Sequence, residues 1–211
     1  MSDRIVPAAE IRVEMRVSNS RFIATITPAF TVEDARLFVG RVRAEFTDAS
    51  HNVPAYLIGH GATTIAHCHD DGEPSGTAGR PALAVLQGSG LGDVALVVTR
   101  YFGGTKLGTG GLVRAYGDAA REAVAAVPRA AKVATVTVMA EVAYPLLERA
   151  RLLVAGHGGL ILEEQFAGEI TLTARFREEE FPGFADGLRE LTHGASEAIV
   201  ISTNPATLMP L

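Results

Sequence analysis

Residues 70–127 read DDGEPSGTAGRPALAVLQGSGLGDVALVVTRYFGGTKLGTGGLVRAYGDAAREAVAAV, and most of the information in this chain lies in them. Two glycine-rich loops, residues 71–79 and 101–111, each lead into apolar residues at helical spacing. Between them, residues 94–99 form a continuous apolar run, which is typical of a strand buried on both faces. Of the 22 glycines, 12 fall within residues 72–117. Such a cluster indicates positive φ angles or close approach of the backbone to another group.

The composition is that of an ordinary globular protein, with 47% hydrophobic and 20% charged residues among 211. This length allows one large or two modest domains. No apolar run approaches the roughly 18 residues of a membrane span, and the N-terminus lacks the pattern of a signal peptide. Cys68 is the single cysteine, which excludes an internal disulfide and fits a reducing compartment. We therefore expect a cytoplasmic protein without membrane contact.

Charge is distributed unevenly along the chain. Residues 1–130 carry 13 basic and 13 acidic side chains, whereas residues 131–211 carry 6 basic and 11 acidic, which accounts for the net charge of −5. A protein that binds duplex DNA by neutralising phosphates normally has a basic excess, so we do not expect a DNA duplex as partner. Any contact with a polyanion must be local and lie in the first part of the chain.

The first part predicts a mixture of strands and helices. Thr31 is a candidate N-cap, and Asp34 completes a weak capping box. Strands are predicted at residues 10–17, 21–27, 54–59 and 94–100, and helices at residues 32–46, 81–87 and 112–127. A boundary is expected near Pro128, where a helix ends and the charge balance shifts.

The second part has the element order β-α-β-β-α-β, which is the ferredoxin-like, split βαβ pattern. Its predicted strands are residues 132–142, 159–166, 169–177 and 198–202, and its predicted helices are residues 144–156 and 181–192. We expect an α+β protein with two domains, residues 1–130 and residues 132–211.

The stretch from residue 70 to residue 124 resembles the signature of the IMPACT/YigZ family. Residues 20–24 (SRFIA) and the pair His51-Asn52 match motifs that lie upstream of this signature in the family. The resemblance covers residues 15–127 closely. Residues 132–211 resemble the small C-terminal domain of bacterial members in element order only.

This resemblance implies a first domain like domain 2 of ribosomal protein S5 and a second like the fifth domain of elongation factor G. Eukaryotic members dampen a starvation-responsive translation-factor kinase by competing for its ribosome-associated activator, which depends partly on an additional N-terminal RWD domain. The chain begins directly at the signature domain, so we do not expect that role to carry over. Bacterial members supply no settled molecular activity to transfer.

The second glycine-rich loop is a candidate anion or nucleic-acid site. Lys106 lies in it, Thr109 is a possible N-cap of the next helix, and backbone N–H groups at such a helix N-terminus favour anions. The chain uses arginine for 17 of its 19 basic residues and yet has lysine at 106. Alternatively, the glycines only allow tight packing. The residues assigned to this site are Arg21, Arg100, Tyr101, Lys106, Thr109, Gly110 and Arg114.

Three acids, Asp70, Asp71 and Glu73, precede the other loop. They could bind Mg²⁺, but capping of the glycine turns or pairing with Arg80 or Arg100 is favoured. No other cofactor is expected.

His67, Cys68 and His69 suggest zinc, but they are too few and too poorly spaced for a structural site, so we predict no metal there. Cys68 has no identifiable base that would activate it as a nucleophile. His51-Asn52 fits a role in a turn as well as a role in catalysis.

We expect a binding protein without enzymatic activity that contacts RNA or a ribosome-associated protein and modulates translation. The alternative is an enzyme that acts on a phosphorylated small molecule or nucleotide at the glycine-rich loops, because several kinases share the S5-like fold. Fold analogy is weak support for such an activity. A protein-interaction module without an anion site is the third interpretation.

Overall fold

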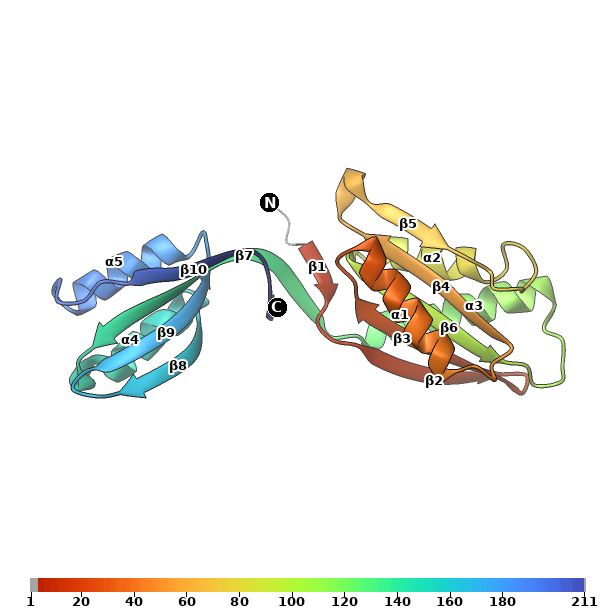
Figure 1. The fold of residues 1–211 in the computed structure, drawn as a ribbon, viewed down its shortest axis with the longest axis horizontal. Coiled ribbons are helices and arrows are strands. Elements are labelled where there is room, and N and C mark those ends of the chain that lie inside the picture. The colour runs from red at the N-terminus through yellow and green to blue at the C-terminus, as the bar shows by residue number, and fades with distance from the viewer. Residues whose placement is uncertain (1–3, 211) are drawn as a thin grey trace. The chain divides into compact units, whose positions relative to one another are not determined.

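The computed structural model describes residues 4–210, which belong to two compact units. The first contains the described residues up to Ala131 together with Met209 and Pro210, and the second comprises Lys132–Leu208. The elements in chain order are β1 (Arg4–Pro7), β2 (Ile11–Val17), β3 (Ser20–Pro28), α1 (Val32–Glu45), β4 (His51–Ile58), the 3₁₀ helix η1 (Gly61–Thr63), β5 (Ile65–Cys68), α2 (Gly79–Gly88), β6 (Val94–Tyr101), α3 (Gly108–Ala126), β7 (Arg129–Val142), the 3₁₀ helix η2 (Tyr144–Leu146), α4 (Leu147–Gly156), β8 (Leu160–Phe166), β9 (Ile170–Arg177), α5 (Phe181–Leu191) and β10 (Ile199–Pro210). This composition confirms the α+β fold class with two-domain architecture (Figure 1). We propose residues 1–130 and 132–211 as the limits of the two domains.

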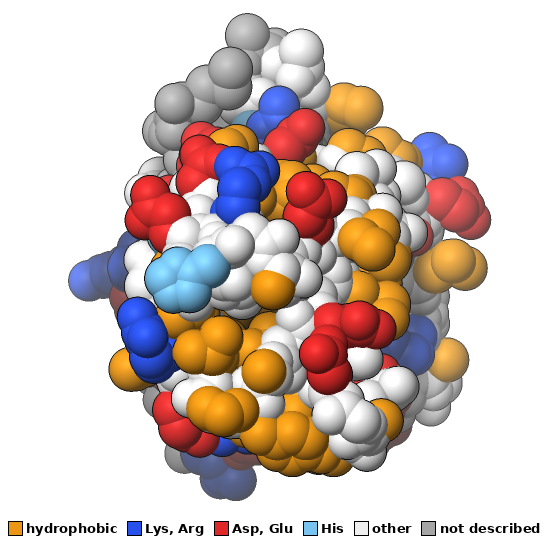
Figure 2. Space-filling model, turned by 90° about the vertical axis from the view of Figure 1, so that its left-hand side faces the viewer, with side chains coloured by type: hydrophobic (Ala, Val, Ile, Leu, Met, Phe, Trp, Pro, Cys, Tyr) orange, Lys and Arg blue, Asp and Glu red, His pale blue; other side chains and the backbone are white. Residues whose placement is uncertain are grey.

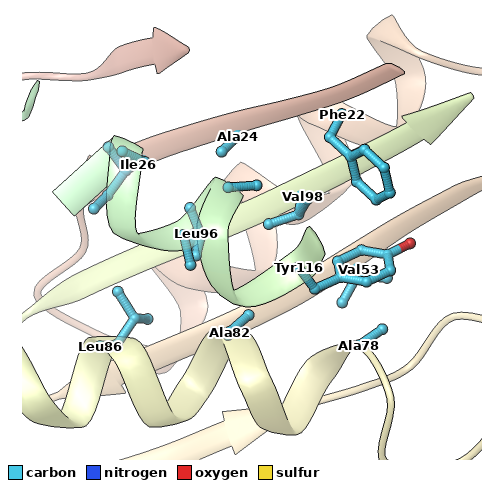
Figure 3. Close-up of a cluster of buried hydrophobic side chains, with 14 of the residues drawn as sticks. Phe22, Ala24, Ile26, Val53, Ala78, Ala82, Leu86, Leu96, Val98 and Tyr116 are labelled. Atoms are coloured by element: carbon cyan, nitrogen blue, oxygen red, sulfur yellow. The ribbon is translucent and has the colours of Figure 1, made fainter. Parts of the chain in front are cut away.

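The apolar strand β6 lies at the centre of the first unit. It belongs to a five-stranded antiparallel sheet with the order β2-β3-β6-β4-β5. Leu96 and Val98 point to the face covered by α2 and α3, where Leu86 and Tyr116 join the same core cluster (Figure 3). The alternate residues of β6 pack on the other face, with side chains of α1. Both faces of β6 are therefore buried, as the continuous apolar run predicted.

Local signals placed most elements of the first unit correctly. The β2–β3 hairpin turns at Ser18 and Asn19, whose φ angles of 46° and 67° are those of a tight hairpin turn. Thr31 caps α1, and its side chain and that of Asp34 form the predicted capping box. Two short strands, β1 and β5, were not predicted from the sequence. β5 is an edge strand with mostly exposed side chains, so it lacks the apolar alternation on which the prediction depends.

Two glycines of the loops are required by close backbone contacts. A Cβ atom on Gly103 would lie 2.1 Å from the backbone carbon of Asn19, because the second loop packs against the β2–β3 turn. A Cβ on Gly79 would lie 2.8 Å from the carbonyl oxygen of His69. Real Cβ atoms do not approach other atoms so closely, so at these two positions glycine serves packing.

The second unit has the ferredoxin-like topology that its element order predicted. β9 pairs with β7 on one side and β8 on the other, and β10 pairs with β7, which gives the strand order β10-β7-β9-β8. The strictly alternating burial of β9 places Ile170, Leu172, Ala174 and Phe176 in the core, where they pack with side chains of α4 and α5. β10 is longer than the predicted residues 198–202. β1 is joined to the same sheet through pairing with β7.

Hydrophobic and acidic side chains share the surface of the second unit. Leu152, Phe166 and Ile199 are 72%, 59% and 66% exposed. On the face shown in Figure 2, hydrophobic side chains lie next to acidic ones. None of the helices within residues 4–210 is both long and apolar enough to cross a membrane.

Candidate functional site

A buried carboxylate, Glu73, connects the two glycine-rich loops. Its Oε1 accepts hydrogen bonds from Arg100 Nη1 at 2.5 Å and from the hydroxyl of Tyr116 at 2.8 Å. The side chains of Glu73 and Arg100 are only 4% and 5% exposed. Because a buried charge is costly unless it is paired, each of these two charges requires the other. Glu73 belongs to the first loop, Arg100 to the end of β6 and Tyr116 to α3, so one carboxylate ties together three separate segments.

Tyr116 and His51 complete this network. Burial raises the pKa of Tyr116 far above its ordinary value, and the adjacent Glu73 carboxylate adds to the effect. His51 Nδ1 lies 2.8 Å from the carbonyl oxygen of Asp71, which can only accept, so this ring nitrogen carries a proton. His51 Nε2 lies 3.7 Å from Glu73 Oε1. Tyr116 therefore remains a neutral hydrogen-bond donor to Glu73.

The other two loop acids stabilise backbone turns. Asp70 accepts hydrogen bonds from the backbone N–H groups of Gly76, Ala78 and Gly79, the last two at the start of α2. Burial acts to raise the pKa of Asp70, but these three donors outweigh it and the pKa is lowered. Asp71 accepts from the backbone N–H of Asn52 at 2.6 Å and from Arg43 at 2.7 Å. In the structure, Asp70 thus holds backbone N–H groups, and Asp71 pairs with Arg43, which was not one of the expected partners.

Arg100 supports an exposed aromatic ring. Its guanidinium carbon lies 5.6 Å from the ring centroid of Phe102 and 5.4 Å from that of Phe22. The ring of Phe22 is buried, whereas Phe102 is 50% exposed. The backbone of the second loop is held by Ser20 Oγ, which accepts from Gly103 N–H and from Arg100 Nη2. A fixed, exposed aromatic residue thus lies at the start of this loop.

The structure corrects two of the residues assigned to the anion site. Arg100 was expected to contact an external anion, but it is buried and its charge is neutralised by Glu73. Thr109 was expected to be the N-cap, but α3 begins at Gly108 and the N-cap residue is Leu107, with no side-chain capping bond. Gly108 has a φ of 69°, a left-handed conformation that lets the chain turn into the helix before Thr109 is reached.

The remaining candidates lie at the surface. Lys106 and Arg114 are exposed, and neither forms an ion pair within the described part of the chain. Gly110 is exposed in the first turn of α3, and a Cβ atom there would meet nothing within 4 Å. Arg114 Nε donates to the Gly110 carbonyl at 3.4 Å.

Arg21 and Tyr101 face each other across the β3–β6 pair. The Arg21 guanidinium lies 5.4 Å from the ring centroid of Tyr101 and also pairs with Glu14 at 2.9 Å. The Tyr101 hydroxyl donates to Asp48. We use the term loop surface for six residues from the start of β3, the end of β6, the loop that follows β6 and the first turns of α3. The set consists of Arg21, Tyr101, Phe102, Lys106, Gly110 and Arg114.

The candidate zinc ligands do not converge. β5 alternates its side chains, so that Cys68 packs against the core while His67 and His69 line a groove on the other face of the sheet. Burial raises the pKa of Cys68, and the nearby Asp70 carboxylate also raises it, which disfavours the reactive thiolate. Among the described residues, no group of three or more His, Cys, Asp or Glu side chains is arranged to hold a metal ion.

Sequence reasoning did not identify Phe102, Ser20 and Tyr116 as parts of the site. Tyr116 was recognised only as part of the buried stripe of its helix. Its hydroxyl and Ser20 Oγ contact partners that are 43 and 80 residues away in the chain. Phe102 could have been noticed as an aromatic residue inside a glycine-rich loop, where large apolar side chains have no core to enter.

Comparisons with known proteins agree on one family. Residues 18–124 match the family described as the Impact N-terminal domain, and residues 141–195 match a domain of unknown function (DUF1949). An IMPACT family member from Haemophilus influenzae is 35% identical over 195 residues, which cover 92% of this chain and 95% of that protein. The IMPACT family member YigZ from Escherichia coli is 34% identical over 202 residues, covering 95% and 99%. A crystal structure of a hypothetical protein superposes with a TM-score of 0.61 at 34% identity, covering 96% and 98%.

Proposed function

The chain belongs to the IMPACT family, and on this premise we propose that it is a translation-related binding protein whose first unit contacts single-stranded RNA through the loop surface. The translation-related role is proposed from membership of a family whose eukaryotic members act on translation, without their competition for the ribosome-associated activator. A cytoplasmic setting is part of the proposal, because contact with the translation machinery requires it.

The observation that carries the RNA contact is the exposed ring of Phe102 in the same loop as the exposed Lys106. Proteins that bind single strands combine aromatic platforms for the bases with positive charge for the backbone. Phe102 and Tyr101 supply rings, and Lys106 and Arg114 supply charges that no acid in the described chain neutralises. This local arrangement fits a unit whose basic and acidic residues are equal in number.

The second unit is a poorer candidate for RNA. It contains the whole acidic excess of the chain, and its surface exposes apolar side chains such as Leu152. Acidic and apolar surfaces are better suited to protein partners than to phosphates. We therefore assign any contact with a ribosome-associated protein to this unit and the RNA contact to the first.

The test is fluorescence anisotropy with a labelled single-stranded RNA of about ten nucleotides, since one binding fold commonly occupies about 4–16. Phe102→Ala should weaken binding by about tenfold, because stacking contributes about 1–3 kcal/mol per base. Lys106→Ala should weaken it about tenfold and lower the salt dependence by roughly one released counterion.

Arg41→Ala is the matched control. Arg41 is exposed on α1 and pairs with Glu10, away from the loop surface, so its loss should leave RNA affinity unchanged. Equal affinities of the Lys106→Ala and Arg41→Ala variants would contradict the site. Absence of RNA binding by the unaltered protein would contradict the RNA contact and leave a protein partner as the explanation.

An enzyme acting on a phosphorylated compound is the second candidate, and His51 is the observation in its favour. The side chain of His51 is 23% exposed, and it links the buried Glu73 to the surface. A histidine beside a carboxylate can transfer protons. Turnover of nucleotides in the presence of Mg²⁺ that is lost in His51→Gln, with RNA binding retained, would favour this candidate.

A further inference from the structure

A groove separate from the loop surface lies on the α1 side of the sheet. It has a volume of about 410 Å³, within the range of about 300–1,000 Å³ that is usual for small-molecule sites. Its walls come from α1, β4 and the chain around β5. The lining residues are Arg36, Val39, Gly40, Arg43, Pro54, Tyr56, His67 and His69.

The charged residues that line this groove, Arg36 and Arg43, are both arginines. Arg36 and Arg43 are seven residues apart on α1, which places them on the same face, about 10 Å apart along the axis. None of the lining residues is acidic. Arg43 is held by Asp71 at 2.7 Å, whereas Arg36 is exposed and forms no ion pair within the described residues. The groove therefore presents at least one uncompensated guanidinium in a chain of net charge −5.

Both histidines of the groove are held in place. The ring of His67 stacks on that of Tyr56, with centroids 5.0 Å apart and planes at 27°. Tyr56 is 6% exposed, so its buried ring supports the exposed imidazole of His67 from one side. His69 Nδ1 accepts a hydrogen bond from the backbone N–H of Asp71 at 2.9 Å, so the proton of a neutral ring is on Nε2. His69 can thus donate a hydrogen bond in the neutral as well as the protonated state.

We propose that this groove binds a nucleoside phosphate. The phosphate would lie against Arg36 and Arg43, because guanidinium groups bind phosphate oxygens through paired, charge-assisted hydrogen bonds. The base would stack on the free face of the His67 ring, since histidine is among the side chains on which bases stack. The groove offers one ring, that of His67, for one base and two arginines for one phosphate group. This number of groups matches a single nucleotide rather than a continuous strand. The site is independent of the RNA contact, since it shares no residue with the loop surface.

The experiment is isothermal titration calorimetry of the full chain with AMP, adenosine and inorganic phosphate. AMP should bind more tightly than either part alone, because it engages the arginines and the imidazole together. Arg36→Gln should weaken AMP binding about tenfold or more, the usual effect of losing a hydrogen bond to a charged group. His67→Gln should weaken AMP and adenosine binding and leave that of phosphate nearly unchanged.

Arg41→Gln is the control, because Arg41 is on the same helix but does not line the groove. It should bind AMP like the unaltered protein. The proposal is overturned if AMP shows no saturable binding, or if Arg36→Gln and Arg41→Gln bind AMP equally. It is also overturned if Arg36→Gln weakens the binding of a single-stranded RNA but not that of AMP. Lys106→Ala should retain AMP binding, so failure of the RNA proposal and failure of this one can be distinguished.

Discussion

Replacing Glu73 by glutamine should destabilise the first unit strongly. Glu73→Gln keeps the size of the side chain but removes the charge that neutralises Arg100. The guanidinium would stay buried, with Nη1 facing an amide in place of a carboxylate, and its Nε already lacks a hydrogen bond. Removing one partner of a buried ion pair costs about 3–5 kcal/mol. We expect a loss of this size, which is a large part of the stability of an ordinary domain.

Two further variants test the origin of the effect. Tyr116→Phe removes a single hydrogen bond to the same oxygen and should cost less, about 1.5 kcal/mol. The double substitution Glu73→Met with Arg100→Met removes both charges and fills a similar volume. It should recover at least half of the loss caused by Glu73→Gln, since buried pairs replaced by apolar residues are often neutral in stability.

Native-state hydrogen exchange is the suitable assay, because the two units have separate cores. Amides of β6 and α3 should lose protection by about two to three and a half orders of magnitude, since each 1.4 kcal/mol corresponds to a factor of ten. Amides of β9, in the second unit, provide the internal reference. A loss below about 1 kcal/mol at β6 would refute the reasoning, as would a double variant no more stable than Glu73→Gln.

Three other predictions concern the same unit. The hydrogen bonds that lower the pKa of Asp70 stabilise the fold at any pH above the pKa of Asp70 in the unfolded chain, near 3.8. This contribution is lost as the pH falls through the lower pKa of Asp70 in the folded protein. Asp70→Asn should therefore be less stable than the unaltered protein at pH 7, and the difference should shrink in urea titrations at progressively lower pH. Gly110→Ala should raise stability by about 0.4–1 kcal/mol yet weaken RNA binding, whereas Gly40→Ala on α1 should raise stability and leave RNA binding unchanged. Elemental analysis should find no stoichiometric zinc in the purified protein. Bound zinc that disappears when residues 67–69 are replaced would contradict this prediction, which depends on the different directions of their side chains.

The parts of the fold that follow local rules were predictable from the sequence. The apolar run of β6, the capping box at Thr31 and the alternation in β9 each depend on residues a few positions apart. The ferredoxin-like topology followed because the order of its elements allows few arrangements. β5 was missed because it is held by main-chain pairing with β4, and its exposed side chains carry no apolar pattern.

The buried network was not predictable in the same way. Sequence reasoning named Glu73 and Arg100 and considered a salt bridge between the loop acids and Arg100. It nevertheless retained Arg100 as a ligand for an external anion, because nothing local to a strand end shows whether a charged side chain turns inwards. That choice is decided by a carboxylate 27 residues away and by the ring of Phe22 on the neighbouring strand. Long-range pairing also explains why the contributions of Ser20 and Tyr116 were missed.

Some glycines of the loops are explained by packing within the chain, and one is not. Gly79 and Gly103 are fixed by backbone atoms of the chain itself, so the packing interpretation is sufficient for them. Gly110 differs, since its φ is not positive and an added Cβ would meet nothing within 4 Å. Glycine is a poor helix former, so its presence at an exposed helical position lowers stability. No close contact within the described chain requires glycine at this position. A glycine of this kind, in the first turn of α3 and four residues after Lys106, is explained if the backbone of a ligand approaches there. The same position therefore gives the RNA proposal its sharpest test, because stability and binding should change in opposite directions.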